Sequence, residues 1–109
     1  MLEKKIEKYL VEQCETYGFL CDKFTSPQRR SVPDRVVTAG GYVFFVELKA
    51  TNKKPTEAQA RDHTRRSEAG ADVFWTDSKE GVDVILKGLY LMTVGPAPLH
   101  LVIPRDETF

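Results

Sequence analysis

The sequence lacks any apolar run approaching the ~20 residues needed to span a bilayer, which predicts a protein without a transmembrane helix. Its first residues, MLEKK, also lack the apolar centre and small-residue cleavage site of a signal peptide. Cysteine is scarce, since only Cys14 and Cys21 occur and their spacing is not that of metal ligands. We interpret both as reduced thiols of an intracellular, cytoplasmic protein.

An overall basic excess is missing too, because 16 Lys and Arg balance 16 Asp and Glu. A neutral total argues mildly against nucleic-acid binding, for which a basic domain is typical. The distribution is uneven, however: residues 25–66 contain nine basic and four acidic residues, a net charge of +5, whereas 1–24 carry −1 and 67–109 carry −4. The middle third could therefore hold acidic metal ligands among phosphate-binding cations.

Hydrophobic periodicity and turn residues predict one domain over residues 1–109, with no internal repeat or linker. The predicted elements are helix 2–17, strands 19–24, 35–38 and 42–48, helix 56–69, strand 71–76, and a helix around 82–89. Thr56 and Ser78 are the expected helix caps. The order αβββαβα predicts an α/β fold, a mixed central sheet with helices on its faces. The tail, 93–109, is expected to add an edge strand or a dimer contact.

The two β-rich runs flank Gly40-Gly41, which favours a two-residue hairpin loop. Paired positions then sum to 81, so Asp34 lies opposite Glu47, and Lys49 follows on the same face as Glu47. Two carboxylates about 5 Å apart at their roots repel unless a cation lies between them. Hard oxygen ligands suit Mg²⁺ or Mn²⁺ rather than zinc. A longer loop would shift the register by one and put the two acids on opposite faces.

A solvated strand end is the alternative explanation of Glu47 and Lys49. The preceding run, YVFFV at 42–46, is apolar on both faces, which is typical of a covered central strand. Charged residues that end such a strand are costly unless they are paired or functional. The pattern therefore favours a functional site over a solvated edge.

The motif Pro33-Asp34 followed by Glu47-Leu48-Lys49 resembles the PD-(D/E)XK nuclease superfamily. Its surroundings resemble one branch in particular, the virus-type replication–repair nuclease (VRR-NUC) domain. The segments that carry this likeness, between Glu3 and about Trp75, are VPDRVV at 32–37, FVELKA at 45–50, TEAQ at 56–59 and AGA at 69–71. The resemblance implies a restriction-endonuclease-like core.

The resemblance also implies roles for the motif residues. Asp34, Glu47 and the backbone carbonyl of Leu48 would bind Mg²⁺, with Mn²⁺ as a substitute, and Lys49 would orient or help to deprotonate the attacking water. Glu3 would complete the site from the first helix, directly or through water. The alternative for Glu3 is a first-turn acid that favours the helix dipole. Glu7 is the fallback ligand, although it lies about 40° further toward solvent on the helix.

Gln59 has two interpretations that the sequence leaves open. Thr56-x-x-Gln59 has the pattern of a capping box, in which the glutamine bonds back to the backbone of Thr56. The family resemblance instead implies a glutamine near the catalytic site. His63 and His100 have no ligand spacing, and we assign them no metal.

Basic residues near the motif are candidate DNA contacts, and a solvated basic surface is the alternative for each of them singly. They are Arg29, Arg30, Arg35, Lys53, Lys54, Arg61, Arg65 and Arg66.

The expected function is that of a metal-dependent, structure-specific DNA endonuclease of phage or bacterial origin. Standalone members of the family resemble Holliday-junction resolvases, so the resemblance implies branched or four-way DNA as substrate and a homodimer with two sites. The apolar segments 89–92 and 99–103 are the expected dimer interface. Two alternatives are a nuclease of the same superfamily that acts on flaps, ends or single strands, and a non-catalytic DNA-binding module.

Overall fold

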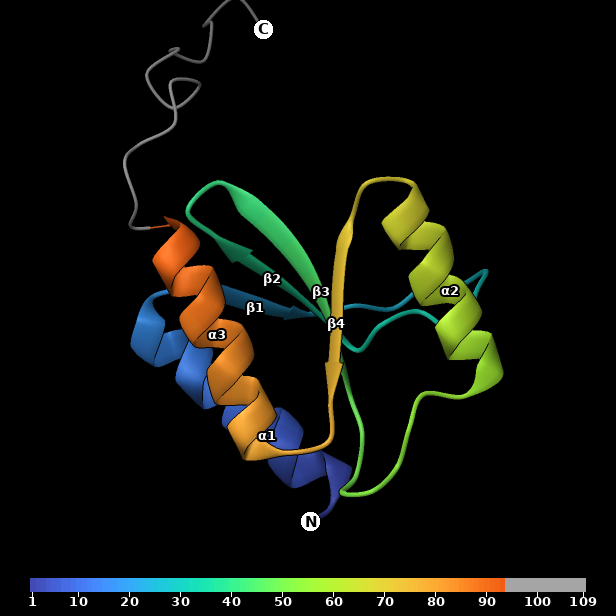
Figure 1. Ribbon diagram of the computed structural model, residues 1–109, viewed down its shortest axis with the longest axis horizontal. Coiled ribbons are helices and arrows are strands. Elements are labelled where there is room, and N and C mark those ends of the chain that lie inside the picture. Colours follow the sequence, from blue (N-terminus) through green and yellow to red (C-terminus); the bar gives the residue numbers. More distant parts are fainter. Residues whose placement is uncertain (94–109) are drawn as a thin grey trace, which may run out of the picture.

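The computed structural model describes residues 1–93, so the expected strand and dimer contact within 94–109 lie outside the described residues. Seven elements follow the predicted order αβββαβα (Figure 1). They are α1 (Glu3–Tyr17), β1 (Leu20–Lys23), β2 (Arg35–Ala39), β3 (Tyr42–Leu48), α2 (Glu57–Glu68), β4 (Asp72–Thr76) and α3 (Lys79–Thr93). None of the helices within residues 1–93 is long and apolar enough to cross a membrane.

The four strands form one mixed sheet in the order β1-β2-β3-β4. The first three strands are antiparallel, and β4 pairs with β3 in parallel because α2 forms the crossover between them. Helices α1 and α3 lie together on one side of the sheet, and α2 lies on the other side (Figure 1). The predicted α/β class and mixed sheet are confirmed.

The apolar core lies between the sheet and the pair α1 and α3. Its members are the fully or almost fully buried Ile6, Leu10, Cys14, Val37, Ala39, Phe44, Val46, Leu48, Val82, Leu86 and Leu89. In β3 the core-facing positions are 44, 46 and 48, so 45, 47 and 49 face α2, as strand alternation predicts. The inclusion of Leu89 in a dimer interface is wrong, because α3 extends to Thr93 and this side chain packs into the core with 2% exposure.

The hairpin between β2 and β3 has the predicted two-residue loop. Gly40 and Gly41 have φ angles of 55° and 90°, which is the left-handed backbone that a tight primed turn requires. The ladder runs from Ala39 opposite Tyr42 to Arg35 opposite Val46, so the predicted register is confirmed. The next step of this ladder brings Asp34 to the level of Glu47, on the same side of the sheet.

Candidate active site

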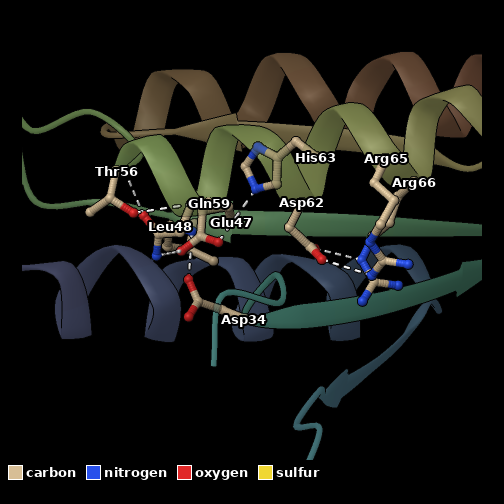
Figure 2. A network of polar contacts seen from close by, with 9 residues as sticks. All are labelled: Asp34, Glu47, Leu48, Thr56, Gln59, Asp62, His63, Arg65 and Arg66. Carbon is tan, nitrogen blue, oxygen red and sulfur yellow. Dashed lines mark hydrogen bonds and ion pairs between the residues drawn. The ribbon is translucent and has the colours of Figure 1, made fainter. Parts of the chain in front are cut away.

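Asp34 and Glu47 form the centre of the candidate site, at the end of the hairpin next to α2 (Figure 2). Asp34 precedes β2, and its Oδ2 accepts a hydrogen bond of 2.8 Å from the backbone N–H of Leu48. This bond ties the aspartate to β3, so the side chain lies beside Glu47 and does not turn to the opposite face. A residue's N–H and C=O face the same neighbouring strand, so the Leu48 carbonyl is also directed to the Asp34 side.

Glu47 is the buried acid of the pair, with 1% of its surface exposed. Burial and, after it, the nearby Asp34 raise the pKa of this carboxyl to about 8, although the ammonium of Lys49 acts in the opposite direction. Its Oε1 atom is buried and has no hydrogen-bond partner among the described residues. A buried, unpartnered carboxylate oxygen next to a second acid is costly unless a cation meets it. These residues therefore fit a divalent metal.

The described residues offer too few ligands to surround a metal ion completely. Within residues 1–93 no three Asp, Glu, His or Cys side chains come together as a metal-holding group. The protein offers two carboxylates and the Leu48 carbonyl. Such a partial set suits Mg²⁺, which keeps several of its waters when it binds to proteins.

Gln59 forms the expected capping box and also contacts Glu47. Its side-chain oxygen accepts a bond of 2.9 Å from the backbone N–H of Thr56, and the Thr56 hydroxyl accepts one of 3.2 Å from the N–H of Gln59, which completes the capping box. Its Nε2 donates a bond of 3.2 Å to Oε2 of Glu47. The first turn of α2 is thus fixed to the buried acid.

His63 is a residue of this site that the sequence analysis missed. Its Nε2 lies 3.5 Å from Oε1 of Glu47, and its side chain is 14% exposed. Burial is the largest influence on this imidazole and lowers its pKa. The missed signal is helical spacing, because His63 follows Gln59 by four residues and so lies on the same face of α2.

Of the two glutamates of α1 that were considered as ligands, Glu3 and Glu7, only Glu7 differs from the expectation. Glu3 is exposed, and partial burial together with Asp34 raises its pKa, which places it near the acidic pair. Glu7 was expected to lie further toward solvent than Glu3, and this is wrong, because its side chain is only 16% exposed whereas Glu3 is exposed. It accepts bonds of 2.7 Å from Arg35 and 3.3 Å from Lys23. Although burial acts in the opposite direction, these two cations lower the pKa of Glu7. Glu7 is thus occupied by structural ion pairs.

Lys49 follows β3 on the same face as Glu47 and is half-buried. Its backbone N–H donates a bond of 2.9 Å to the carbonyl of Thr76, which extends the pairing with β4 past the end of the strand. Burial raises the pKa of both Glu47 and Glu3, and the charge of Lys49 acts in the opposite direction on both carboxyls.

The eight candidate DNA-contacting cations fall into two groups. Arg35 and Arg66 are engaged within the fold: Arg35 binds Glu7, and Arg66 binds Asp62 at 2.7 Å. Arg65 also binds Asp62, at 2.8 Å, but remains about half exposed. The other five are exposed: Arg29 and Arg30 before β2, Lys53 and Lys54 between β3 and α2, and Arg61 on α2.

Similar proteins agree with this architecture. A curated protein named "Putative nuclease p44", from Acyrthosiphon pisum secondary endosymbiont phage 1, is 44% identical over 79 residues, which are 72% of this chain and 85% of that protein. A solved structure described as "VRR_NUC domain" is 36% identical, with a TM-score of 0.72 over 78% of this chain and 94% of that one.

A second solved structure, "VRR_NUC domain protein", shares the fold at 12% identity, with a TM-score of 0.68 over 90% of this chain and 98% of that one. No family model matches the sequence. The mixed sheet with helices on its faces, together with these relatives, defines a nuclease of the restriction-endonuclease-like fold. With the identities above, the chain belongs to the VRR-NUC domain family.

Proposed function

We propose that this VRR-NUC domain is a Mg²⁺-dependent DNA endonuclease that hydrolyses phosphodiester bonds in branched DNA. The observation that carries the proposal is the pair of acids at the end of the hairpin. Asp34 is bound to the backbone beside Glu47, the Oε1 of Glu47 is buried without a partner, and Lys49 lies close by. Buried titratable groups that perturb one another in this way are typical of catalytic sites.

Asp34, Glu47 and the Leu48 carbonyl would hold the Mg²⁺ ion, for which Mn²⁺ could substitute, and Glu3 would reach it from α1 directly or through water. When bound, the ion supplies Lewis-acid chemistry and activates water. Gln59 orients Glu47 through its bond to Oε2. Lys49 would orient the attacking water and balance the negative charge of the phosphate.

Four-way junctions are the proposed substrate, and the active form is a homodimer. A junction has two-fold symmetry and needs two coordinated cuts, which two identical sites provide. The exposed cations near the acids favour contacts to the backbone and the shape of DNA over reading of bases. Exposed apolar side chains on α3 support a surface for a second copy: Val84, Leu91 and Met92 are 73%, 60% and 53% exposed.

Cleavage of labelled four-way junctions, flaps, single strands and linear duplexes, with Mg²⁺, Mn²⁺ or chelator, tests this function. We expect junctions to be cut fastest, with either metal and not with chelator. Lys49→Ala should abolish cleavage and leave binding largely intact, and Lys8→Ala, at an exposed position of α1 on the far side of the sheet, is the matched control. If flaps or single strands are cut faster than junctions, the substrate is that DNA and not the four-way junction. Binding of every DNA without any cleavage would make the chain a non-catalytic module.

Light scattering tests the homodimer separately. We expect a dimer at micromolar concentration, reduced to a monomer by Leu91→Lys together with Met92→Lys. A monomer of the unchanged protein at that concentration would overturn this part of the proposal.

A further inference from the structure

A cavity of about 410 Å³, open to solvent, lies between α2 and the segment that precedes β2. Its lining residues are Arg29, Arg30, Ser31, Ala58, Arg61, Asp62 and Arg65. Four of these seven carry a guanidinium group, so the cavity is strongly basic in a chain whose net charge is zero.

The acid of the cavity, Asp62, is already neutralised. It is 5% exposed, and its two oxygens bind Arg65 at 2.8 Å and Arg66 at 2.7 Å (Figure 2). Although burial acts in the opposite direction, these two arginines lower its pKa. Asp62 therefore holds Arg65 in place at the cavity wall, and the negative charge that remains for Arg29, Arg30 and Arg61 is small.

Arg66 fixes the two walls of the cavity to each other. Its guanidinium lies 5.0 Å from the ring centroid of Phe24 and 5.1 Å from that of Phe45. Phe24 begins the segment that carries Arg29 and Arg30, and Phe45 belongs to the central strand. These cation–π contacts connect that segment, β3 and α2, so the arginines of both walls face one space.

The basic cavity adjoins the acidic site. A neighbouring cavity of about 340 Å³ is lined by Asp34, Pro33 and Lys23 among others, and it shares Arg29 and Arg30 with the first. A strand whose phosphate lies at Asp34 and Glu47 can therefore continue past these two arginines toward Arg61 and Arg65.

We propose that the cavity between the Arg29-Arg30 segment and α2 binds a non-scissile phosphate of the strand that is being cut. This inference rests on the proposed nuclease function. A planar guanidinium group can donate two parallel hydrogen bonds to two oxygens of one phosphate. Several arginines on facing walls of a cavity can therefore bind a phosphate that lies between them. No aromatic side chain lines this cavity within residues 1–93, so it offers no platform for stacking a base. The cavity thus holds the position of the strand and does not read its sequence.

Binding of a labelled four-way junction with a fixed branch point in chelator, measured by fluorescence anisotropy at several salt concentrations, tests the inference without cleavage. The pocket variant is Arg30→Gln with Arg61→Gln. Both side chains are exposed, and Arg61 makes only a 4.0 Å contact with Glu57, so the fold should persist. We expect weaker binding, about tenfold at low salt, and a salt slope smaller by about 0.9 for each phosphate contact that is lost. Lys5→Gln with Lys8→Gln, two exposed positions of α1, removes equal charge from the opposite side of the sheet and is the control, which should leave the slope unchanged.

Single methylphosphonate linkages, which are neutral, then locate the contact along the strand. A neutral linkage at one particular position, distant from the scissile bond, should weaken binding by the wild type. The same linkage should not weaken binding by the pocket variant any further. Equal salt slopes of pocket and control variants, or neutral linkages that weaken both proteins alike, would overturn the inference. Competition by inorganic phosphate without any sensitive linkage would also overturn it, because the cavity would then be an ion site. Cleavage in Mg²⁺ is measured separately. If the cavity binds a phosphate as expected but no DNA is cut, the proposed nuclease function is refuted and the proposed phosphate site is not.

Discussion

The Nε2 of His63 and the Oε1 of Glu47 lie 3.5 Å apart, and neither atom has a hydrogen-bond partner among the described residues. Burial lowers the pKa of the imidazole and raises that of the carboxyl to about 8. At neutral pH without metal, both groups are therefore expected to be uncharged. A metal ion that binds Glu47 must displace its proton, which makes metal binding dependent on pH.

Metal affinity should consequently rise with pH. We expect the apparent affinity for Mn²⁺ to increase by up to about tenfold for each pH unit between pH 6 and pH 8, and to level off above the Glu47 pKa of about 8. Titration calorimetry in buffers of different ionisation enthalpy should detect release of about one proton at pH 7. An affinity that is constant from pH 6 to pH 9, without proton release, would contradict this account.

Stability of the metal-free protein should change with pH in the opposite direction. Between the ordinary carboxyl pKa of 4.5 and the folded value of about 8, the unfolded chain has lost the Glu47 proton and the folded chain still holds it. This group's contribution to the free energy of unfolding is therefore complete below pH 4.5 and is lost as pH rises to 8, by at most about 1.4 kcal/mol per pH unit.

Glu47→Gln isolates that contribution, because glutamine is neutral at every pH. In chelator, urea unfolding should show that this variant is more stable than the wild type at pH 8.5 and similar to it at pH 4.5. In Mg²⁺, the same variant should not cleave DNA. If the variant is destabilised equally at both pH values, the pKa of Glu47 is not raised in the folded protein.

Gln59 offers a way to separate helix capping from catalysis. Thr56→Ala removes half of the capping box and should cost about 1 kcal/mol of stability with little change in cleavage rate. Gln59→Glu can still cap the helix, but it replaces the Nε2 donor by an acidic oxygen next to Glu47. We expect Gln59→Glu to slow cleavage at least tenfold at near-normal stability. Normal cleavage by Gln59→Glu would leave Gln59 a helix cap only.

Arg66 and Arg61 should differ in what they contribute. Arg66→Ala leaves the buried Asp62 with one arginine and removes both cation–π contacts, which should cost about 2 kcal/mol in urea unfolding. Arg61→Ala, whose side chain is 73% exposed, should change stability by less than about 0.5 kcal/mol and weaken DNA binding instead. Equal losses of stability in the two variants would contradict this division of the arginines.

The fold and the centre of the site could be predicted because both depend on local sequence rules. Gly40-Gly41 sets the turn, the turn sets the register, and the register brings Asp34 to Glu47. Helix boundaries followed from caps such as Thr56, which the structure confirms.

The parts that could not be predicted depend on contacts between elements. Nothing local indicates that Lys23 and Arg35 would cover Glu7, because they belong to two different strands. The position of α2 over the sheet decides that His63 meets Glu47. The same packing decides that Arg66 lies over Phe24 and Phe45 and is not free for DNA.

Anomalous scattering from crystals soaked in Mn²⁺ shows whether Asp34 and Glu47 together bind a metal ion. We predict a single strong peak within about 2.3 Å of carboxylate oxygens of both Asp34 and Glu47 and of the Leu48 carbonyl, which disappears in Glu47→Gln crystals soaked in the same way. A protein that cleaves DNA but shows its Mn²⁺ peak elsewhere, or no peak at a concentration that supports cleavage, would contradict the account.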